Sequence, residues 1–203
     1  MTQGSQGDGG RKGRGPRSSP GPTLSPSVDL DRNLPLEHPL RLFLAEHALM
    51  RRLADELDEY CSRLARNRGN RIENLAKIRG LALELQSASR AHHRREEEAL
   101  FGQLRARGVH GPPDVLETEH DDFDQLEADL VRLAAELQLA PQADPTALFQ
   151  AASSLIALSR SHIHRENEVL FPMVLELFTR DGIWDEVQRV SDTIPSSTSE
   201  DES

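Results

Sequence analysis

The stretch SRAHHRREEEALF runs from Ser89 to Phe101, and SRSHIHRENEVLF repeats it from Ser159 to Phe171. Eight of the thirteen paired positions are identical, and they include one histidine and one glutamate four residues apart in each copy. Residues four apart share one face of an α-helix. Each copy therefore predicts a helix that presents a His-x-x-x-Glu pair on a single face.

The face that carries each pair is otherwise apolar. Equivalent positions at helical spacing are occupied by Ile78, Ala82, Leu85, Ser89 and Leu100 in the first copy and by Leu148, Ala152, Leu155, Ser159 and Leu170 in the second. A continuous apolar face of this kind packs into a protein core. The histidine and the glutamate of each pair are thus predicted to be buried.

A second, shorter repeat precedes each block. EHALMRRLADEL begins at Glu46 and EHDDFDQLEADL begins at Glu119, which aligns His47 with His120. The chain is therefore two copies of a helical hairpin, each with one histidine on its first helix and the His-x-x-x-Glu pair on its second.

Helix breakers divide the chain into four long helices. The first is expected from about Pro39 to the turn at residues 68–70, the second ends near Gly108, Pro141–Pro145 close the third, and the fourth covers residues 146–178 with a bend at Pro172. A short amphipathic piece is expected at residues 183–190. With 36% hydrophobic and only 4% aromatic residues, the composition suits a core of Leu and Ala. The predicted fold is all-α, an up-down-up-down antiparallel four-helix bundle with a pseudo-twofold repeat of hairpins.

The ends differ in composition from this core. Residues 1–34 are rich in Gly, Pro, Ser and Arg and are expected to be a disordered tail, residues 35–192 form the bundle, and residues 193–203 form a disordered acidic tail. A net charge of −10 argues against a nucleic-acid partner, and no apolar run is long enough to span a membrane. The single cysteine, Cys61, favours a reducing compartment, which predicts a cytoplasmic protein.

Counting from the turns places the polar residues at one height in the bundle. In an antiparallel hairpin, residues equidistant from the turn lie level, since each helix rises about 1.5 Å per residue. The midpoint of 47 and 92 is 69.5, that of 96 and 120 is 108, and that of 120 and 162 is 141, and each falls in a predicted turn. One layer is therefore predicted to contain His47, His92, Glu96, His120, His162 and Glu166.

Four imidazoles and two carboxylates in a core require a partner, because burying an unpaired carboxylate costs several kcal/mol. Metal cations are the natural partner, and this donor set favours iron, manganese or zinc. Two carboxylates with histidines at both ends suit a pair of ions better than a single ion. A seventh ligand could be His93, Asp124, Glu119 or an exogenous water.

The blocks AEHALM, HHRREEEALF, TEHDDF and HIHRENEVLFPM resemble the hemerythrin-like, or HHE cation-binding, family over residues 39–178. The resemblance implies a non-haem di-iron centre with an oxo or hydroxo bridge, in which Glu96 and Glu166 also bridge and the four histidines cap the ions. The oxygen-carrier pattern differs, since it has a histidine where this chain has Asp124 and an Asp where it has Glu166. In an iron-sulfur repair group of the family a further histidine follows the first by about 21 residues, and Arg68 at this place weakens that assignment.

The resemblance leaves two kinds of function open. One is a di-iron module that binds or senses O2, NO or peroxide, and the other is a di-iron enzyme that turns over peroxide or nitric oxide or assists iron-sulfur cluster repair. A small diatomic or peroxide ligand is implied in either case, with a protein partner or electron donor unidentified. A bundle with bis-histidine haem is disfavoured by the paired glutamates and the lack of a haem-attachment motif.

Overall fold

The computed structural model describes residues 30–195, and these form helices joined by turns, with no strand among them. The helices are α1 (Leu30–Asn33), α2 (Leu40–Ala65), α3 (Arg71–Glu96), the π-helical segment η1 (Glu97–Phe101), α4 (Gly102–Arg105), α5 (Gly111–Leu139), α6 (Thr146–Arg165), the π-helical segment η2 (Glu166–Leu170), α7 (Phe171–Asp181) and α8 (Trp184–Ser191). The predicted all-helical class is confirmed. None of the described helices combines the length and the apolar character that a membrane span requires.

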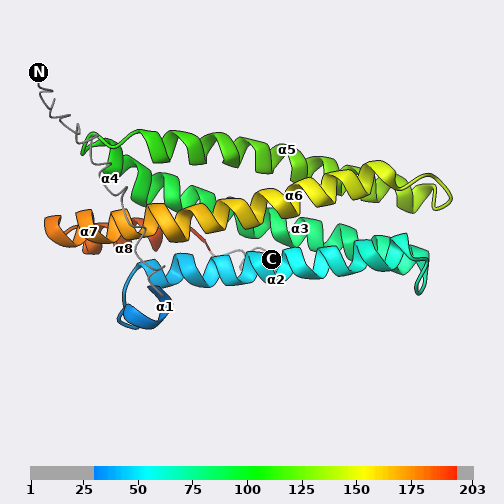
Figure 1. Ribbon diagram of the computed structural model, residues 1–203, viewed down its shortest axis with the longest axis horizontal. Coiled ribbons are helices and arrows are strands. Elements are labelled where there is room, and N and C mark those ends of the chain that lie inside the picture. The colour runs from blue at the N-terminus through cyan, green and yellow to red at the C-terminus, as the bar shows by residue number, and fades with distance from the viewer. Residues whose placement is uncertain (1–29, 196–203) are drawn as a thin grey trace, which may run out of the picture.

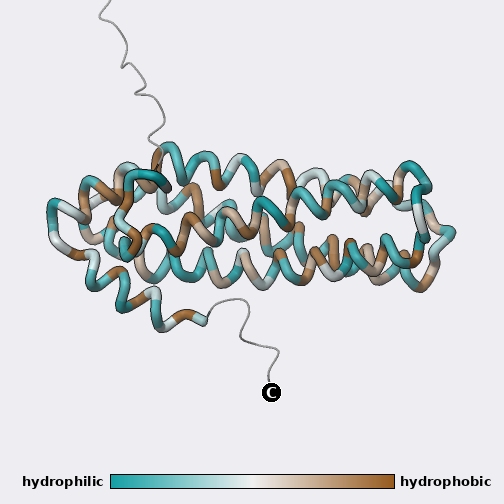
Figure 2. Tube along the Cα trace, turned by 90° about the horizontal axis from the view of Figure 1, so that it is seen from below, coloured by the Kyte–Doolittle hydropathy of each residue, from teal (hydrophilic) through white to brown (hydrophobic). Residues whose placement is uncertain are grey.

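Four long helices lie side by side along the long axis of the molecule (Figure 1). α2 packs against α3 and α6, and α5 packs against α3 and α6. The short helices α1, α4, α7 and α8 gather at one end (Figure 1). Along each long helix hydrophobic and hydrophilic residues interchange (Figure 2), as a helix with one buried face requires.

The turn between α2 and α3 shows how the sequence sets the helix ends. Gly69 has a φ of 74°, a left-handed conformation that glycine adopts without steric cost. The side chain of Asn70 then accepts a hydrogen bond from the backbone N–H of Ile72 at 2.9 Å. This bond satisfies one of the free donors at the start of α3 and fixes its first residue.

Two π-helical segments interrupt the helices that carry the His-x-x-x-Glu pairs. η1 follows Glu96 directly, and η2 begins at Glu166. A π-helical turn contains one residue more than an α-helical turn and is often found at functional sites. Pro172 stands in the first turn of α7, just after η2, so the irregularity predicted at this proline starts before it, at the glutamate.

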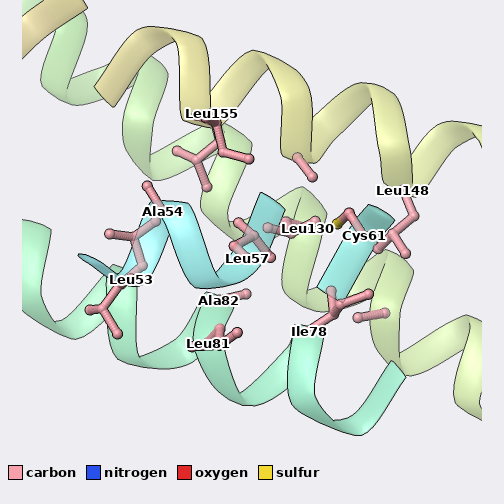
Figure 3. Packing of buried hydrophobic residues seen from close by; sticks show 14 of the residues in the cluster. Leu53, Ala54, Leu57, Cys61, Ile78, Leu81, Ala82, Leu130, Leu148 and Leu155 are labelled. Carbon is pink, nitrogen blue, oxygen red and sulfur yellow. The ribbon is translucent and has the colours of Figure 1, made fainter. Parts of the chain in front are cut away.

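The apolar core is divided into two clusters. One contains Leu57, Ile78, Leu130 and Leu155 together with Ala54 (Figure 3), and it extends to residues 64 and 75 and to residues 137 and 148, on either side of the α2–α3 and α5–α6 turns. The other contains Phe43, Phe101, Phe171 and Phe178 and lies at the end with the short helices. On α2 His47 stands between Phe43 of the second cluster and Met50 of the first, and on α5 His120 stands between Leu116 and Phe123 in the same way.

The predicted N-terminal tail, residues 1–34, includes residues that the structure packs against the bundle. Leu30 and Leu34 are buried in the end cluster, and Leu30 belongs to α1. At the other end Ile194 is also buried, since the segment after α8 returns to the bundle. The remainder of both predicted tails, residues 1–29 and 196–203, lies outside the described residues.

Candidate metal centre

The structure brings the six predicted residues together from four helices. Their donor atoms form two overlapping groups, and within each group the atoms lie within 4.8 Å of one another. The first group is His47, His92, Glu96 and Glu166, and the second is Glu96, His120, His162 and Glu166. All six side chains are buried. Both glutamates belong to both groups, whereas each histidine belongs to only one of these two.

Each glutamate spans the two hairpins with its two oxygens. Glu96 Oε1 lies 3.6 Å from His92 Nε2, and Glu96 Oε2 lies 3.5 Å from His120 Nε2. Glu166 Oε1 lies 2.9 Å from His162 Nε2, and Glu166 Oε2 lies 2.8 Å from His47 Nε2. Each carboxylate therefore faces one imidazole of its own hairpin and one of the other.

In the part of the chain that the structure describes, most of the inward-facing atoms lack hydrogen bonds, the exceptions being His47 Nε2 and His92 Nε2, which lie 3.0 Å apart. Among residues 30–195 no hydrogen-bond partner is found for His120 Nε2, His162 Nε2 or any of the four oxygens of Glu96 and Glu166. Buried polar atoms without partners are rare in native proteins because each costs desolvation energy. Neutral imidazole and carboxylate donors converging in this way fit divalent cations.

The outer nitrogen of every predicted histidine ligand is held by an oxygen. His92 Nδ1 donates to Glu46 at 3.0 Å and His162 Nδ1 donates to Glu119 at 2.9 Å. His47 Nδ1 donates to Asn167 at 3.1 Å, and His120 Nδ1 donates to Glu97 at 2.7 Å. A neutral imidazole with its hydrogen held on Nδ1 presents the lone pair of Nε2 to the centre. Burial alone would lower the pKa of His92, but the carboxylates of Glu96 and Glu166 outweigh it and raise that pKa well above its usual value, so this imidazole must lose a proton before it binds a cation.

An arginine supports each of the two outer glutamates. Arg95 pairs with Glu46, and Arg165 pairs with Glu119. Arg95 is 1% exposed and also donates to the carbonyl oxygens of Ser191 and Ile194, whereas Arg165 is 39% exposed. These partners were not predicted from the sequence, but both repeats mark them, since Glu precedes the histidine in EHALM and EHDDF and the arginine is identical in the longer blocks.

Burial and close contacts among the imidazoles and carboxylates shift the pKa values in the centre. Burial and the neighbouring Glu166 raise the pKa of Glu96 well above its usual value. Burial alone would also raise the pKa of Glu166, but the imidazole of His162 and those of His47 and His92 outweigh it and lower that pKa. Burial and His162 lower the pKa of His120 to about 3, so its imidazole is neutral at pH 7 and able to bind a cation.

Of the further candidates, only His93 joins the histidines. Its ring stacks on His120 with centroids 3.8 Å apart, and its donor atom groups with those of His120 and His162. Asp124 does not join them, because it is 57% exposed and pairs with Arg90 at 3.1 Å. Glu119 serves as the partner of His162 described above. Outside the centre, His110 and His164 are exposed, while His38 is half-buried against Trp184.

A buried carboxyl that the sequence analysis did not single out lies beside the layer. Glu127 is fully buried and accepts a hydrogen bond from Ser89 Oγ at 2.7 Å. The turn count identifies this pair, because the midpoint of 89 and 127 is 108, the same as for Glu96 and His120. Ser159, the repeat equivalent of Ser89, is buried without a hydrogen-bond partner among the described residues.

A sequence model of the Hemerythrin HHE cation binding domain matches residues 38–174. This range contains every residue of the two four-residue groups and both π-helical segments.

Curated relatives match over parts of the chain. The iron-sulfur cluster repair protein YtfE of Musicola paradisiaca is 36% identical over 91 residues, which cover 41% of this chain and 40% of that protein. YtfE of Edwardsiella ictaluri is 35% identical over 106 residues, 48% of each chain, and the iron-sulfur cluster repair protein DnrN of Neisseria gonorrhoeae is 31% identical over 107 residues, 50% of this chain and 68% of that one. The chain thus spans less than half the length of the two YtfE proteins.

Proposed function

Because the chain belongs to the hemerythrin HHE cation-binding domain family, we propose that its buried layer holds two iron ions and that the protein binds or senses O2, NO or peroxide. The observation that carries the proposal is the placement of Glu96 and Glu166, each with one oxygen toward either hairpin. Two ions joined by these carboxylates would satisfy all of the inward-facing atoms that lack hydrogen bonds.

The residues divide naturally between the two ions. His47 and His92 would hold one ion and His120 and His162 the other, with His93 as a further ligand of the second, and Glu96 and Glu166 would be shared. Iron in such a centre supplies ligand binding and change of valence. The protein's own contribution is to fix the imidazoles through their outer nitrogens and to shield the layer with apolar clusters on both sides.

The arrangement of the long helices supports the same proposal. We infer that α2, α3 with η1, α5, and α6 with η2 run up, down, up and down, because short turns join them and neighbours in sequence pack together. A reducing, cytoplasmic setting is part of the proposal, since Cys61 is buried and unpaired and the family centre uses iron that changes valence.

Anaerobic loading with ferrous iron tests this function. We expect about two irons per chain and, after addition of O2, NO or peroxide in turn, absorption typical of a bridged ferric pair or of a ligand complex. A clean ratio of one zinc per chain would contradict the iron pair while leaving the fold intact.

Iron-sulfur cluster repair is the second function that a specific observation favours, because three relatives bear that name. Arg68 stands where that group is expected to have a further histidine, and it lies in the turn after α2, outside the layer. Repair would require transfer of iron to a damaged cluster protein, so the loaded chain should restore the activity of such a protein. Turnover of peroxide or NO, with a separate electron donor where the reaction needs one, would appear instead as consumption of these molecules.

A further inference from the structure

Glu127 and Ser89 form a buried polar pair that the iron ligands do not include. Both side chains are fully buried, and the Ser89 hydroxyl donates to Glu127 Oε1 at 2.7 Å. Within residues 30–195 Glu127 Oε2 has no hydrogen-bond partner. A buried carboxyl with one oxygen unsatisfied costs stability, and replacement by an apolar residue would be the simpler way to fill a core.

The pair lies next to the metal layer. Ser89 is three residues before His92 on α3, which is about 4.5 Å along the helix axis, and Glu127 is seven residues after His120 on α5, which is about 10 Å. Side chains on a helix lean toward its N-terminus. On α5 this direction leads from Glu127 toward His120. The carboxyl of Glu127 therefore meets Ser89 close to the metal layer, on the side of the α2–α3 turn.

The repeat shows that the bundle does not need a carboxyl here. The position equivalent to Glu127 in the first hairpin, seven residues after His47, is Ala54, which is buried in the apolar cluster. The serine equivalent to Ser89 is Ser159, which has no such partner. The carboxyl is therefore a feature of one side of the centre alone.

We propose that Glu127, held by Ser89, is a proton donor and acceptor for small ligands that bind in the metal layer as anions. The inference rests on the proposed iron pair. When a weak acid HX such as hydrogen peroxide enters, Ser89 passes its hydroxyl proton to ionised Glu127 and takes the proton of HX, so that X⁻ and neutral Glu127 result and Ser89 is unchanged. The reverse transfer releases HX.

A group that both donates and accepts protons near neutral pH needs a pKa close to 7. Burial raises the pKa of Glu127 to about 7, against the hydrogen bond from Ser89, which lowers it. Asp124 on the same helix raises this pKa further, and Arg90 on α3 lowers it. Two other elements pack on α5. The ionisable residues of α6 are Arg160, His162, His164 and Arg165, and those of η1 are Glu97 and Glu98.

Infrared spectra of the metal-free protein test the protonation of Glu127. The difference between the parent and Glu127→Gln should contain a carboxylic acid C=O band that disappears with a midpoint near pH 7. Ser89→Ala should move this midpoint to higher pH, because it removes the hydrogen bond that stabilises the carboxylate. Ser159→Ala, the matched control, should leave the midpoint unchanged. Absence of such a band in the difference spectrum would overturn the proposal, as would equal midpoints in the parent and Ser89→Ala.

Azide binding to the iron-loaded protein tests the coupling. If Glu127 must be protonated beside the bound anion, azide affinity should fall up to tenfold per pH unit above the midpoint because one proton is taken up. Competition by hydroxide also lowers the azide affinity as the pH rises. Glu127→Gln should keep this contribution to the pH dependence and lose the contribution of Glu127. Two irons per chain in both proteins with equal slopes would overturn this inference alone, whereas a parent that holds no iron pair would overturn the proposed function as well.

Discussion

The two helical hairpins place equivalent residues in the metal layer but surround them differently. His47 and His120 correspond, as do His92 and His162 and the glutamates that span the centre. The surrounding residues differ. His93 and Glu97 of the first hairpin correspond to Ile163 and Asn167 of the second, and Ala54 of the first corresponds to Glu127 of the second. The repeat thus preserves the donor residues of the proposed iron pair and differs in the residues that surround them.

The largest effect is expected from removing one ligand in either hairpin. His47→Ala and His120→Ala should each lower the iron content from about two per chain to one or none. Each should also lose the stabilisation that iron gives to the folded state, about 4 kcal/mol at a thousandfold excess over the dissociation constant. Metal analysis and urea unfolding with and without ferrous iron measure both quantities.

His164→Ala is the matched control, since His164 is exposed two residues from His162. It should change neither iron content nor stability. If His47→Ala kept both ions while His120→Ala lost them, the two hairpins would not be equivalent in the layer.

A smaller but unequal effect is expected from the two arginines. Arg95→Ala should lower the free energy of unfolding by about 3 kcal/mol, because it leaves Glu46 and two carbonyl oxygens without their buried donor. Arg165→Ala should cost about 1 kcal/mol or less, because Arg165 is partly exposed and water replaces it. Urea titration measures both. Equal costs would show that the contact of Arg95 with residues 191–194 adds nothing.

The height of the layer could be predicted from the sequence because it depends on the number of residues between each ligand and the nearest turn. Helical rise and turn positions give the height of each residue, and the structure brings His47, His92, Glu96, His120, His162 and Glu166 together. Height alone does not give the direction of a side chain around its helix. Asp124 follows His120 by four residues, the same spacing as in the two His-x-x-x-Glu pairs, yet it is 57% exposed and pairs with Arg90 rather than with the centre.

The features that the sequence did not predict depend on long-range packing. The π-helical segments η1 and η2 arise where the backbone shifts its hydrogen bonds beside Glu96 and Glu166, and no local preference of residues 97–101 signals it. Likewise Leu30 and Leu34 lie in a segment of tail-like composition, and only the apolar end cluster explains their burial. The height of the Ser89–Glu127 pair follows from the same turn at residue 108, but a serine opposite a glutamate does not by itself indicate burial.

Ser159 corresponds to Ser89 but has no carboxyl partner in the described part of the chain, and a bulky side chain at this position tests whether the space beside it admits a ligand. Ser159→Leu should retain iron and cost about 2 kcal/mol of stability by overfilling the core. If the space beside Ser159 admits a ligand, this variant should bind azide at least tenfold more weakly than the parent. Ser154→Leu on the exposed side of α6 is the control and should bind azide normally. Unchanged azide binding in Ser159→Leu would make Ser159 a packing residue.

The smallest expected effect concerns the outer partners of the two first-helix histidines. His120 Nδ1 donates to the carboxylate of Glu97, whereas His47 Nδ1 donates to the neutral amide oxygen of Asn167. A carboxylate acceptor makes an imidazole a stronger metal donor than an amide does. Glu97→Gln would make the two hairpins alike and should weaken the binding of one iron about tenfold, or about 1.4 kcal/mol.

The reciprocal change, Asn167→Asp, gives His47 the partner that His120 has. It should tighten the binding of the other iron by a similar factor, and chelator competition followed by metal analysis measures both variants. Because Glu97 is 41% exposed, water can replace part of its effect, so a change of only a few-fold remains consistent with the comparison. A Glu97→Gln variant that binds both irons as tightly as the parent would show that the carboxylate does not distinguish the two hairpins, and the difference between them would then rest on His93 and Glu127.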